Sequence, residues 1–499
     1  MPTTPTSRQA ESALANEEAA PRLSIRMYRH GLGDCLLLRF AKEEGGAFNM
    51  LIDCGVVMVA TNAKQTMTEV AEDIRAACNG HLDVVVVTHE HWDHASGFSK
   101  DQARAVFERI TIGEVWYGWT EDPQNELGQR LRQDRAAKVS ALAAAASAFA
   151  NDKTKNAAIK NRGEQLQAVL GFFGIDPTEA LGADQAIGRT REAFEYLMNR
   201  RGIQTEFLYP HKPPLTLPGV PNVRVYVLGP PEDESFIKKS TPSKKNSEVY
   251  EFDSDIGFAA GLAAAFSRIG QENPAHGDDC PFDSRFRHDP SRKHSRESQA
   301  FADLMRDTWD AEGADWRRIE QDWTQAAETL ALNLDSNTNN TCVVLAFEFI
   351  DTGEVFLFPG DAQVGSWLSW QNLSWDVKNG DDARKVVVSD LLAKTVFYKV
   401  GHHGSHNATL RELGLEKMTS NELVAFIPVL EADAKKNRWN NMPFQPLLDR
   451  LEYKTSGRML RADNPAPTPR DLSELPATSR DAFLRRLSEN QLYFEYVFD

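Results

Sequence analysis

The sequence predicts an α/β fold, and three observations support this prediction. Short β-prone runs at 23–28, 35–40 and 49–54 are separated by turn-forming glycines, which indicates an antiparallel meander. Residues 63–79 carry apolar side chains at helical spacing. The next run, 83–88, contains four consecutive valines, as is typical of a strand that is covered on both faces.

Further strands follow along the chain, and two long stretches interrupt them. Strands are expected at 223–228, 341–350, 355–358, 395–400, 423–428 and 492–498. Residues from about 123 to 204 are rich in Ala, Gln, Arg and Lys and predict a partly helical insertion. A second insertion, from about 232 to 335, holds charge-rich loops and helical stretches. Because structureless loops of such length are uncommon in compact domains, we expect the insertions to carry function, a partner contact or a lid.

Composition limits the classes of protein to consider. Residues 1–20 lack an apolar run and are expected to form a disordered tail before a single domain at 21–499. The longest apolar window, 256–266, is too short to span a bilayer, so we expect a cytoplasmic protein without a membrane segment. The 5 cysteines form no CxxC pair, which argues against a disulfide framework. The net charge of −16 argues against a protein that binds nucleic acid, unless basic residues gather locally on its surface.

The strongest chemical signal is the segment ThrHisGluHisTrpAspHis at 88–94. His89 and His91 stand two apart in an extended segment, so both imidazoles can face the same side. Asp93 and His94 follow where the chain turns into a helix. Neutral imidazoles and a carboxylate are suitable ligands for zinc, manganese or iron. The alternative, a solvated polar loop, is disfavoured because exposed imidazoles add little packing.

Two further segments end a strand with polar side chains. PheLeuPheProGlyAsp at 356–361 delivers Asp361, and LysValGlyHisHisGlySer at 399–405 places His402 and His403 directly after the next strand. Open α/β sheets bind ligands at the carboxyl ends of their strands. A lone Asp after a strand is usually a turn residue, but here its placement matches that of the histidine cluster and favours a ligand.

Together these residues resemble a known superfamily. HisGluHisTrpAspHis at 89–94 matches the HxHxDH signature of metallo-β-lactamase-fold hydrolases. Further blocks resemble the branch that contains the soluble domain of ComEC-type competence proteins and the phosphorylcholine esterases. These blocks are GlyAspCysLeuLeuLeu at 33–38, LeuIleAspCysGly at 51–55, AsnAsnThrCysValVal at 339–344, ProGlyAspAla at 359–362 and the segment at 399–405.

The resemblance implies a four-layer αββα sandwich with two divalent metal ions, Zn²⁺ or Mn²⁺, at one edge of its two sheets. It implies that His89 and His91 bind the first ion, that Asp93, His94 and His402 bind the second, and that Asp361 bridges them. His402 is favoured over His403 because family members often present this ligand after a glycine, here Gly401. Asp53 is expected to orient the HxHxDH loop, with Ser405 and His406 beside the ligands.

One departure from the family pattern concerns the first metal. Many members supply a further histidine from a strand end between the two halves, whereas 115–120 and 225–230 carry none here. His211 is the nearest alternative, and it is expected to be a surface residue. The first ion is therefore expected to have an open position that holds water.

These features predict a metal-dependent hydrolase in which a hydroxide bound by two metal ions attacks the substrate. Asp93 and His403 are the candidate catalytic residues, with His403 as general acid. The resemblance favours a phosphodiesterase or nuclease. An acyl hydrolase acting on a lactone, thioester or β-lactam is one alternative, and a non-catalytic subunit of a multi-protein defence system, binding a protein partner through the insertions, is another. A nuclease needs basic residues near the metals, and the candidates are Lys399, Lys435, Lys436, Arg438, Arg458 and Arg461.

Overall fold

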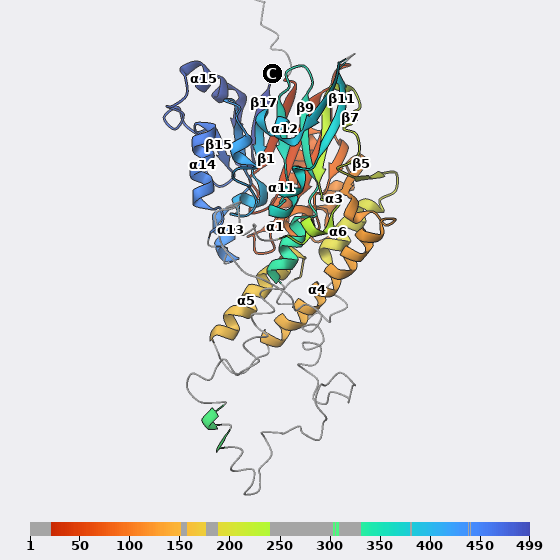
Figure 1. The fold of residues 1–499 in the computed structure, drawn as a ribbon, viewed down its shortest axis with the longest axis vertical. Helices are drawn as coiled ribbons and strands as arrows, with labels where there is room; N and C mark the ends of the chain where they lie inside the picture. The colour runs from red at the N-terminus through yellow and green to blue at the C-terminus, as the bar shows by residue number, and fades with distance from the viewer. Residues whose placement is uncertain are drawn as a thin grey trace, which may run out of the picture.

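The computed structural model describes residues 21–150, 157–175, 188–239, 303–304, 306–308, 331–379, 382–437, 439 and 441–499. Over these residues the fold is mixed α/β, as the sequence predicted, and it is built on two large sheets (Figure 1). The tail predicted at 1–20 and most of the second predicted insertion lie outside the described residues.

Among the described residues, one sheet has eight strands and the other has seven. Across the first sheet the order is β16 (Leu487–Glu489), β17 (Tyr493–Phe498), β1 (Leu23–Tyr28), β2 (Cys35–Ala41), β3 (Ala47–Cys54), β4 (His81–Val86), β5 (Thr111–Gly118) and β6 (Gln204–Leu208). Across the second sheet it is β15 (Met459–Arg461), β14 (Val424–Ile427), β13 (Thr395–Lys399), β10 (Val355–Phe358), β9 (Val344–Phe349), β8 (Val220–Gly229) and β7 (Leu215–Leu217). A separate hairpin pairs β11 (Ser374–Asn379) with β12 (Asp382–Val387).

The helices connect and cover these strands. They are α1 (Ala63–Ala77), α2 (Trp92–Ala95), α3 (Arg104–Phe107), α4 (Glu126–Ala150), α5 (Ala157–Phe172), α6 (Arg189–Met198), α7 (Glu234–Ile237), α11 (Val364–Trp370), α12 (Val388–Ala393), α13 (Glu431–Lys436), α14 (Gln445–Thr455) and α15 (Ala477–Arg486). Helix α1 ends before residue 79 because Asn79 and Gly80 both take a positive φ. No helix in the described ranges is long and apolar enough to cross a membrane.

The strand pairing brings the predicted ligand segments to neighbouring strand ends in each sheet. Strands β1, β2 and β3 form the predicted antiparallel meander. Strand β4 then pairs parallel to β3, and β13 pairs parallel to β10 in the second sheet. Because parallel strands end at the same edge of a sheet, the segments after β3 and β4 lie together, as do those after β10 and β13.

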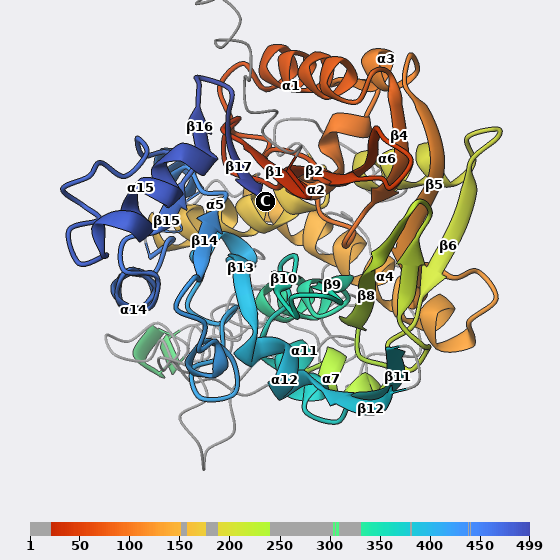
Figure 2. The ribbon, with the colours of Figure 1, turned by 90° about the horizontal axis from the view of Figure 1, so that it is seen from above.

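The two sheets share one hydrophobic core. The ring of Phe40 lies 5.3 Å from that of Phe347, and Phe356 lies 4.7 Å from Phe498, centroid to centroid. The opposite face of the first sheet packs against α1, α3 and α6, and that of the second against α11, α12 and α14 (Figure 2). Burial of each such Phe or Leu side chain contributes about 1.5–3 kcal/mol to the free energy of folding.

The first predicted insertion is helical, as expected, but its parts pack differently. Helices α4 and α5 lie against each other and project beyond the sheets in Figure 1, with a small core that includes Leu142 and Leu170. Helix α6 instead places Phe194 and Leu197 in the core of the first sheet. The α4–α5 pair is therefore the part of 123–204 that is added to the body of the fold.

Candidate metal centre

The segment after β4 carries the first four predicted ligands. Strand β4 ends at Val86, and the single turn of α2 contains both Asp93 and His94. All four side chains of the HxHxDH motif are 0–2% exposed. Gly55 permits this burial, because a Cβ there would lie 2.4 Å from the carbonyl carbon of Asp93.

Asp53 orients this segment from the end of β3. Its Oδ1 accepts a hydrogen bond from the backbone N–H of Thr88 at 2.8 Å, and its Oδ2 accepts one from the Thr88 hydroxyl at 2.7 Å. The same Oδ2 lies 2.7 Å from Nδ1 of His94. A carboxylate in this position fixes the direction of the histidine ring and leaves its Nε2 for another partner. Asp53 thus contacts both the backbone of Thr88 and the ring of His94.

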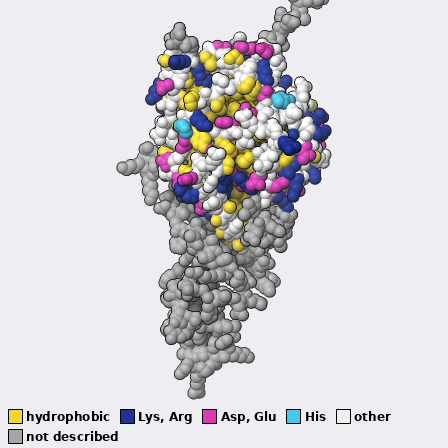
Figure 3. Space-filling view, turned by 90° about the vertical axis from the view of Figure 1, so that its right-hand side faces the viewer, with side chains coloured by type: hydrophobic (Ala, Val, Ile, Leu, Met, Phe, Trp, Pro, Cys, Tyr) yellow, Lys and Arg dark blue, Asp and Glu magenta, His cyan; other side chains and the backbone are white. Residues whose placement is uncertain are grey.

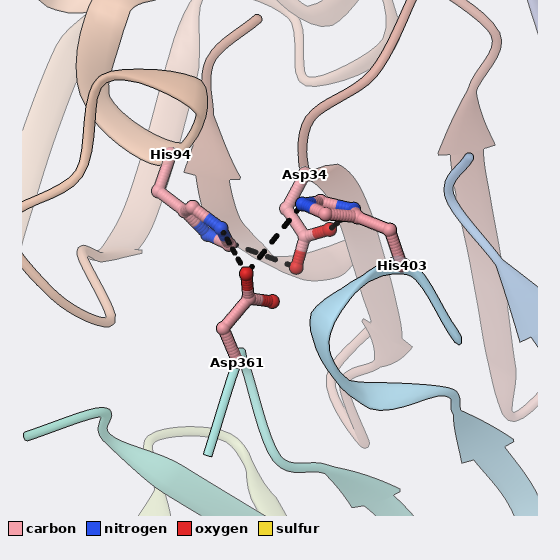
Figure 4. Close-up of side chains that lie close together, drawn as sticks. All are labelled: Asp34, His94, Asp361 and His403. Atoms are coloured by element: carbon pink, nitrogen blue, oxygen red, sulfur yellow. Dashed lines mark ion pairs between the residues drawn. The ribbon is translucent and has the colours of Figure 1, made fainter. Parts of the chain in front are cut away.

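Asp361 lies where the two sheets meet (Figure 4). Its Oδ2 is 3.0 Å from Nε2 of His94 and 3.5 Å from Nε2 of His403. Its Oδ1 accepts hydrogen bonds from the backbone N–H of His402 at 3.1 Å and from Nζ of Lys399 at 3.2 Å. One carboxylate oxygen thus faces two imidazoles, and the other is held by two donors.

Asp34 stands in the GlyAspCysLeuLeuLeu block but was not among the ligands expected from the sequence. In the structure Asp34, His94, Asp361 and His403 each present an atom within 4.8 Å of the others, and all four are buried (Figure 4). Oδ2 of Asp34 pairs with the ammonium of Lys399, which also donates to the carbonyl oxygen of Gly360 at 2.9 Å. Lys399 is 1% exposed, so it holds Asp34 and Asp361 and cannot reach an external phosphate.

The two adjacent histidines after β13 point to different neighbours. Both take a left-handed backbone, with φ of 44° for His402 and 51° for His403. Nε2 of His403 lies 3.1 Å from Oδ2 of Asp93, and its Nδ1 lies 2.8 Å from the carbonyl oxygen of Pro428. Nδ1 of His402 lies 3.1 Å from the side-chain amide of Gln363. His403 therefore occupies the place beside Asp93 and Asp361 that the sequence analysis gave to His402.

The two histidines expected to bind the first metal ion, His89 and His91, lie side by side. His89 and His91 themselves touch, with Nε2 of the first 2.9 Å from Nδ1 of the second. His211, the candidate for a third histidine, is exposed and pairs with Glu232 at 2.7 Å.

Burial and charge divide the histidines into two groups. Burial lowers the pKa of His91 to about 3 and that of His402 to about 4, and it lowers the pKa of His89 well below its ordinary value. Burial also acts on His94 and His403, but Asp361 and the other nearby carboxylates outweigh it and raise the pKa of both. The first group is neutral at neutral pH, which is the form of imidazole that binds a metal.

The donor set fits a metal centre. Nε2 of His91, Oδ1 of Asp93 and Oδ1 of Asp34 are buried without a hydrogen-bond partner. An unsatisfied buried polar group costs about 1–3 kcal/mol, more if it is charged, so several in one place require an explanation. Metal ions bound by imidazole nitrogens and carboxylate oxygens would satisfy these atoms.

The two residues predicted beside the ligands differ in their contacts. Ser405 is buried and donates to Oδ1 of Asn407 at 2.9 Å, and Asn407 donates to Oε1 of Gln363 at 2.8 Å. Ser405 thus supports the amide that contacts His402. His406 is half-buried, and its ring lies 6.0 Å from that of Phe444.

The insertions add residues that no motif could have indicated. Phe172 at the end of α5 stacks on His91 with 5.0 Å between ring centroids, and Phe173 contacts the same ring edge-on, also at 5.0 Å. Asp335, near the end of the second insertion, has a buried Oδ1 without a partner. Burial and the charges of Asp93 and Asp361 raise the pKa of Asp335 to about 8. Of these residues, Phe172 and Phe173 of the first insertion contact a predicted ligand directly.

Glu90, between two of the ligands, is tied to the first insertion. It pairs with Arg135 of α4 and, at 3.1 Å, with Arg191 of α6. Glu121 pairs with the same two arginines at 3.0 and 2.6 Å. This buried network of alternating charges connects the ligand loop to two helices.

No protein-family model matches the chain, and no curated protein matches it.

Proposed function

We propose that the protein is a metal-dependent hydrolase of the metallo-β-lactamase fold whose substrates are phosphodiesters. The observation that carries this proposal is the meeting of His94, Asp361 and His403 from three separate strand-end segments, with buried donor atoms left unpaired. The shared core between two sheets and the helices on their outer faces fit a four-layer αββα sandwich. The HxHxDH and HisHisGlySer segments supply the ligands in the order that this fold requires.

The ligands fall into two groups around Asp361. His89, His91 and His402 would hold one metal ion, and Asp93, His94 and His403 would hold the other, with Asp361 available to both. Bound metal ions in such a centre lower the pKa of water and stabilise negative charge that develops on a phosphoryl or carbonyl oxygen. With His403 as a ligand, the general-acid role given to it by the sequence analysis is not part of this proposal.

The remaining buried residues position the ligands. Asp53 holds His94 and the Thr88 backbone, which fixes the HxHxDH loop against β3. Lys399 neutralises part of the charge of Asp34 and Asp361 and holds one oxygen of Asp361, so that the other faces the histidines. Phe172 and Phe173 cover His91 and exclude bulk water from that side.

The placement of basic residues favours a small phosphodiester over a long nucleic acid. Arg458 is buried and pairs with Glu422, and Arg461 pairs with Glu431 and Asp463. Lys435 and Lys436 pair with acidic neighbours on α13, and Arg438 lies outside the described residues. On the described part of the face in Figure 3, basic and acidic side chains are interspersed.

The experiment that tests this proposal compares substrate classes on one metal-loaded preparation. We expect turnover of methyl p-nitrophenyl phosphate and of a nucleotide p-nitrophenyl ester, both lost in Asp361→Asn. Hydrolysis of a lactone or thioester without any phosphodiester turnover would contradict the phosphodiester assignment and favour the acyl-hydrolase alternative.

A further inference from the structure

A cavity of about 310 Å³ is lined in part by Phe172, whose ring also stacks on His91 of the candidate centre. We call it the α5 pocket. Its wall comes from three segments that are distant in sequence: Val57, Met58 and Val59 after β3; Glu164, Gln167, Ala168, Gly171 and Phe172 of α5; and Lys436, Asn437 and Trp439 after β14. A volume near 300 Å³ is at the lower end of the range for small-molecule sites.

Aromatic rings connect this pocket to the ligands. The ring of Phe172 stacks on His91 at one side, with 5.0 Å between centroids and 24° between planes. At 4.5 Å it also stacks on Trp439, with planes 4° apart. Phe172 therefore belongs both to the wall of the α5 pocket and to the cover of a predicted metal ligand.

The pocket also contains a polar atom that lacks a partner. Asn437 is 7% exposed, and its Nδ2 makes no hydrogen bond. An amide N–H₂ buried in this way destabilises the protein unless an acceptor is supplied. Because Asn437 lines the cavity, a ligand in the cavity can supply that acceptor.

The cationic side chain in the pocket wall, Lys436, already has partners. The ammonium of Lys436 is held by Oδ1 of Asp433 at 2.8 Å and by the hydroxyl of Thr61 at 3.2 Å. Glu164 and Gln167 of α5 add polar side chains, and Val57, Met58, Val59, Ala168, Phe172 and Trp439 make the wall otherwise apolar or aromatic. A flat, neutral ring would bury its faces there at little electrostatic cost.

We propose that the α5 pocket binds the nucleobase of a nucleotide phosphodiester, with Trp439 as the stacking surface and Asn437 as the hydrogen-bond donor. This inference rests on the proposed phosphodiesterase function and names its substrate class. An acyl chain would also fit an apolar wall, but it offers no acceptor to Asn437. A nucleobase carries both a flat face and ring or carbonyl acceptors, so it satisfies both features at once.

The test compares two esters that differ only in the nucleoside: thymidine 5′-(p-nitrophenyl phosphate) and methyl p-nitrophenyl phosphate. The measured quantity is the ratio of their kcat/KM values, so that effects on the metal centre cancel. Trp439→Leu removes one base–aromatic contact and should therefore lower this ratio about tenfold. Asn437→Leu should lower it by a similar factor, whereas Trp439→Phe should retain most of it because a flat ring remains.

Tyr453→Leu is the matched control. Tyr453 is an aromatic residue with a 68% exposed surface on α14, outside the pocket wall, so its replacement should not change the ratio. An unchanged ratio in both Trp439→Leu and Asn437→Leu would overturn the inference while leaving the hydrolase intact.

A direct binding measurement distinguishes failure of this inference from failure of the proposed function. Titration calorimetry with thymidine and adenosine reports binding whether or not either ester is cleaved. If neither ester is hydrolysed but a nucleoside binds in a manner that needs Trp439, the pocket assignment stands and the phosphodiesterase proposal fails. If no nucleoside binds and neither ester is hydrolysed, both fail.

Discussion

Nε2 of His403 lies 3.1 Å from Oδ2 of Asp93, which joins the segment after β13 to the turn of α2 across the junction of the two sheets. The neighbouring His402 points to Gln363 instead. Two consecutive histidines, both with a left-handed backbone, thus contact different neighbours.

The first prediction uses this difference. His403→Ala and Asp93→Ala should each remove the same metal ion, so the double variant should lose no more metal than either single one. His403→Ala combined with His91→Ala should lose both ions, because the two residues belong to separate groups. The measurement is metal content after dialysis, by mass spectrometry. Loss of both ions in the Asp93/His403 double variant, with one retained in each single variant, would show that the two residues are not in one group.

The second prediction concerns Asp53. Asp53→Asn should weaken metal binding about 10- to 100-fold, because His94 loses the carboxylate that fixes its ring. Competition with a chromophoric chelator measures the affinity, and far-ultraviolet circular dichroism checks the fold. Asp376→Asn, at an exposed position of β11, serves as the control. An affinity equal to that of the parent protein would remove Asp53 from the support of the centre.

Much of this arrangement could be predicted from the sequence, for a physical reason. The ligand segments follow short buried strands, and strand ends in parallel sheets meet at one edge. The α/β fold and the meander were therefore accessible from pattern alone, whereas the grouping of His94, Asp361 and the HisHis pair also needed the family resemblance. The position of His403 could not be predicted in this way. It depends on backbone dihedral angles, and two adjacent histidines give no sequence signal that tells their positions apart.

Other parts of the site depend on contacts between segments that share no local pattern. Asp34 and Lys399 are 365 positions apart (399 minus 34), and nothing in either segment indicates that they pair. Phe172 stacks on His91 from an insertion whose sequence indicates only a helix. Lys399 was expected to be a candidate phosphate contact, but it is buried among carboxylates.

The third prediction concerns the link between Glu90 and the first insertion. Glu90→Gln should lower the free energy of unfolding by about 1–3 kcal/mol, because Arg135 and Arg191 then share only Glu121 as a buried partner. The more exposed Glu195 pairs with the same Arg191, and Glu195→Gln should cost less than about 1 kcal/mol. Urea denaturation of both variants checks this. Equal losses would mean that the buried network adds nothing beyond a surface ion pair.

The fourth prediction is a pH dependence of stability in metal-free protein. The pKa of Asp335 is raised to about 8 by burial and by Asp93 and Asp361. A raised carboxyl pKa means that the folded state binds more protons than the unfolded one, so stability falls as pH rises from about 4 to about 8. Asp335→Asn removes this group and should raise Tm at pH 8 while changing it little at pH 4. Parallel Tm profiles for variant and parent would contradict this assignment.

The central claim, a metal-dependent hydrolase built on the His94–Asp361–His403 cluster, is tested most directly by removal and return of the metal. Protein treated with a chelator should lose hydrolysis of methyl p-nitrophenyl phosphate, and titration with Zn²⁺ or Mn²⁺ should restore it as two ions bind per chain. Asp361→Asn should not recover at any metal concentration. Activity that survives complete metal removal, or full recovery in Asp361→Asn, would contradict the account.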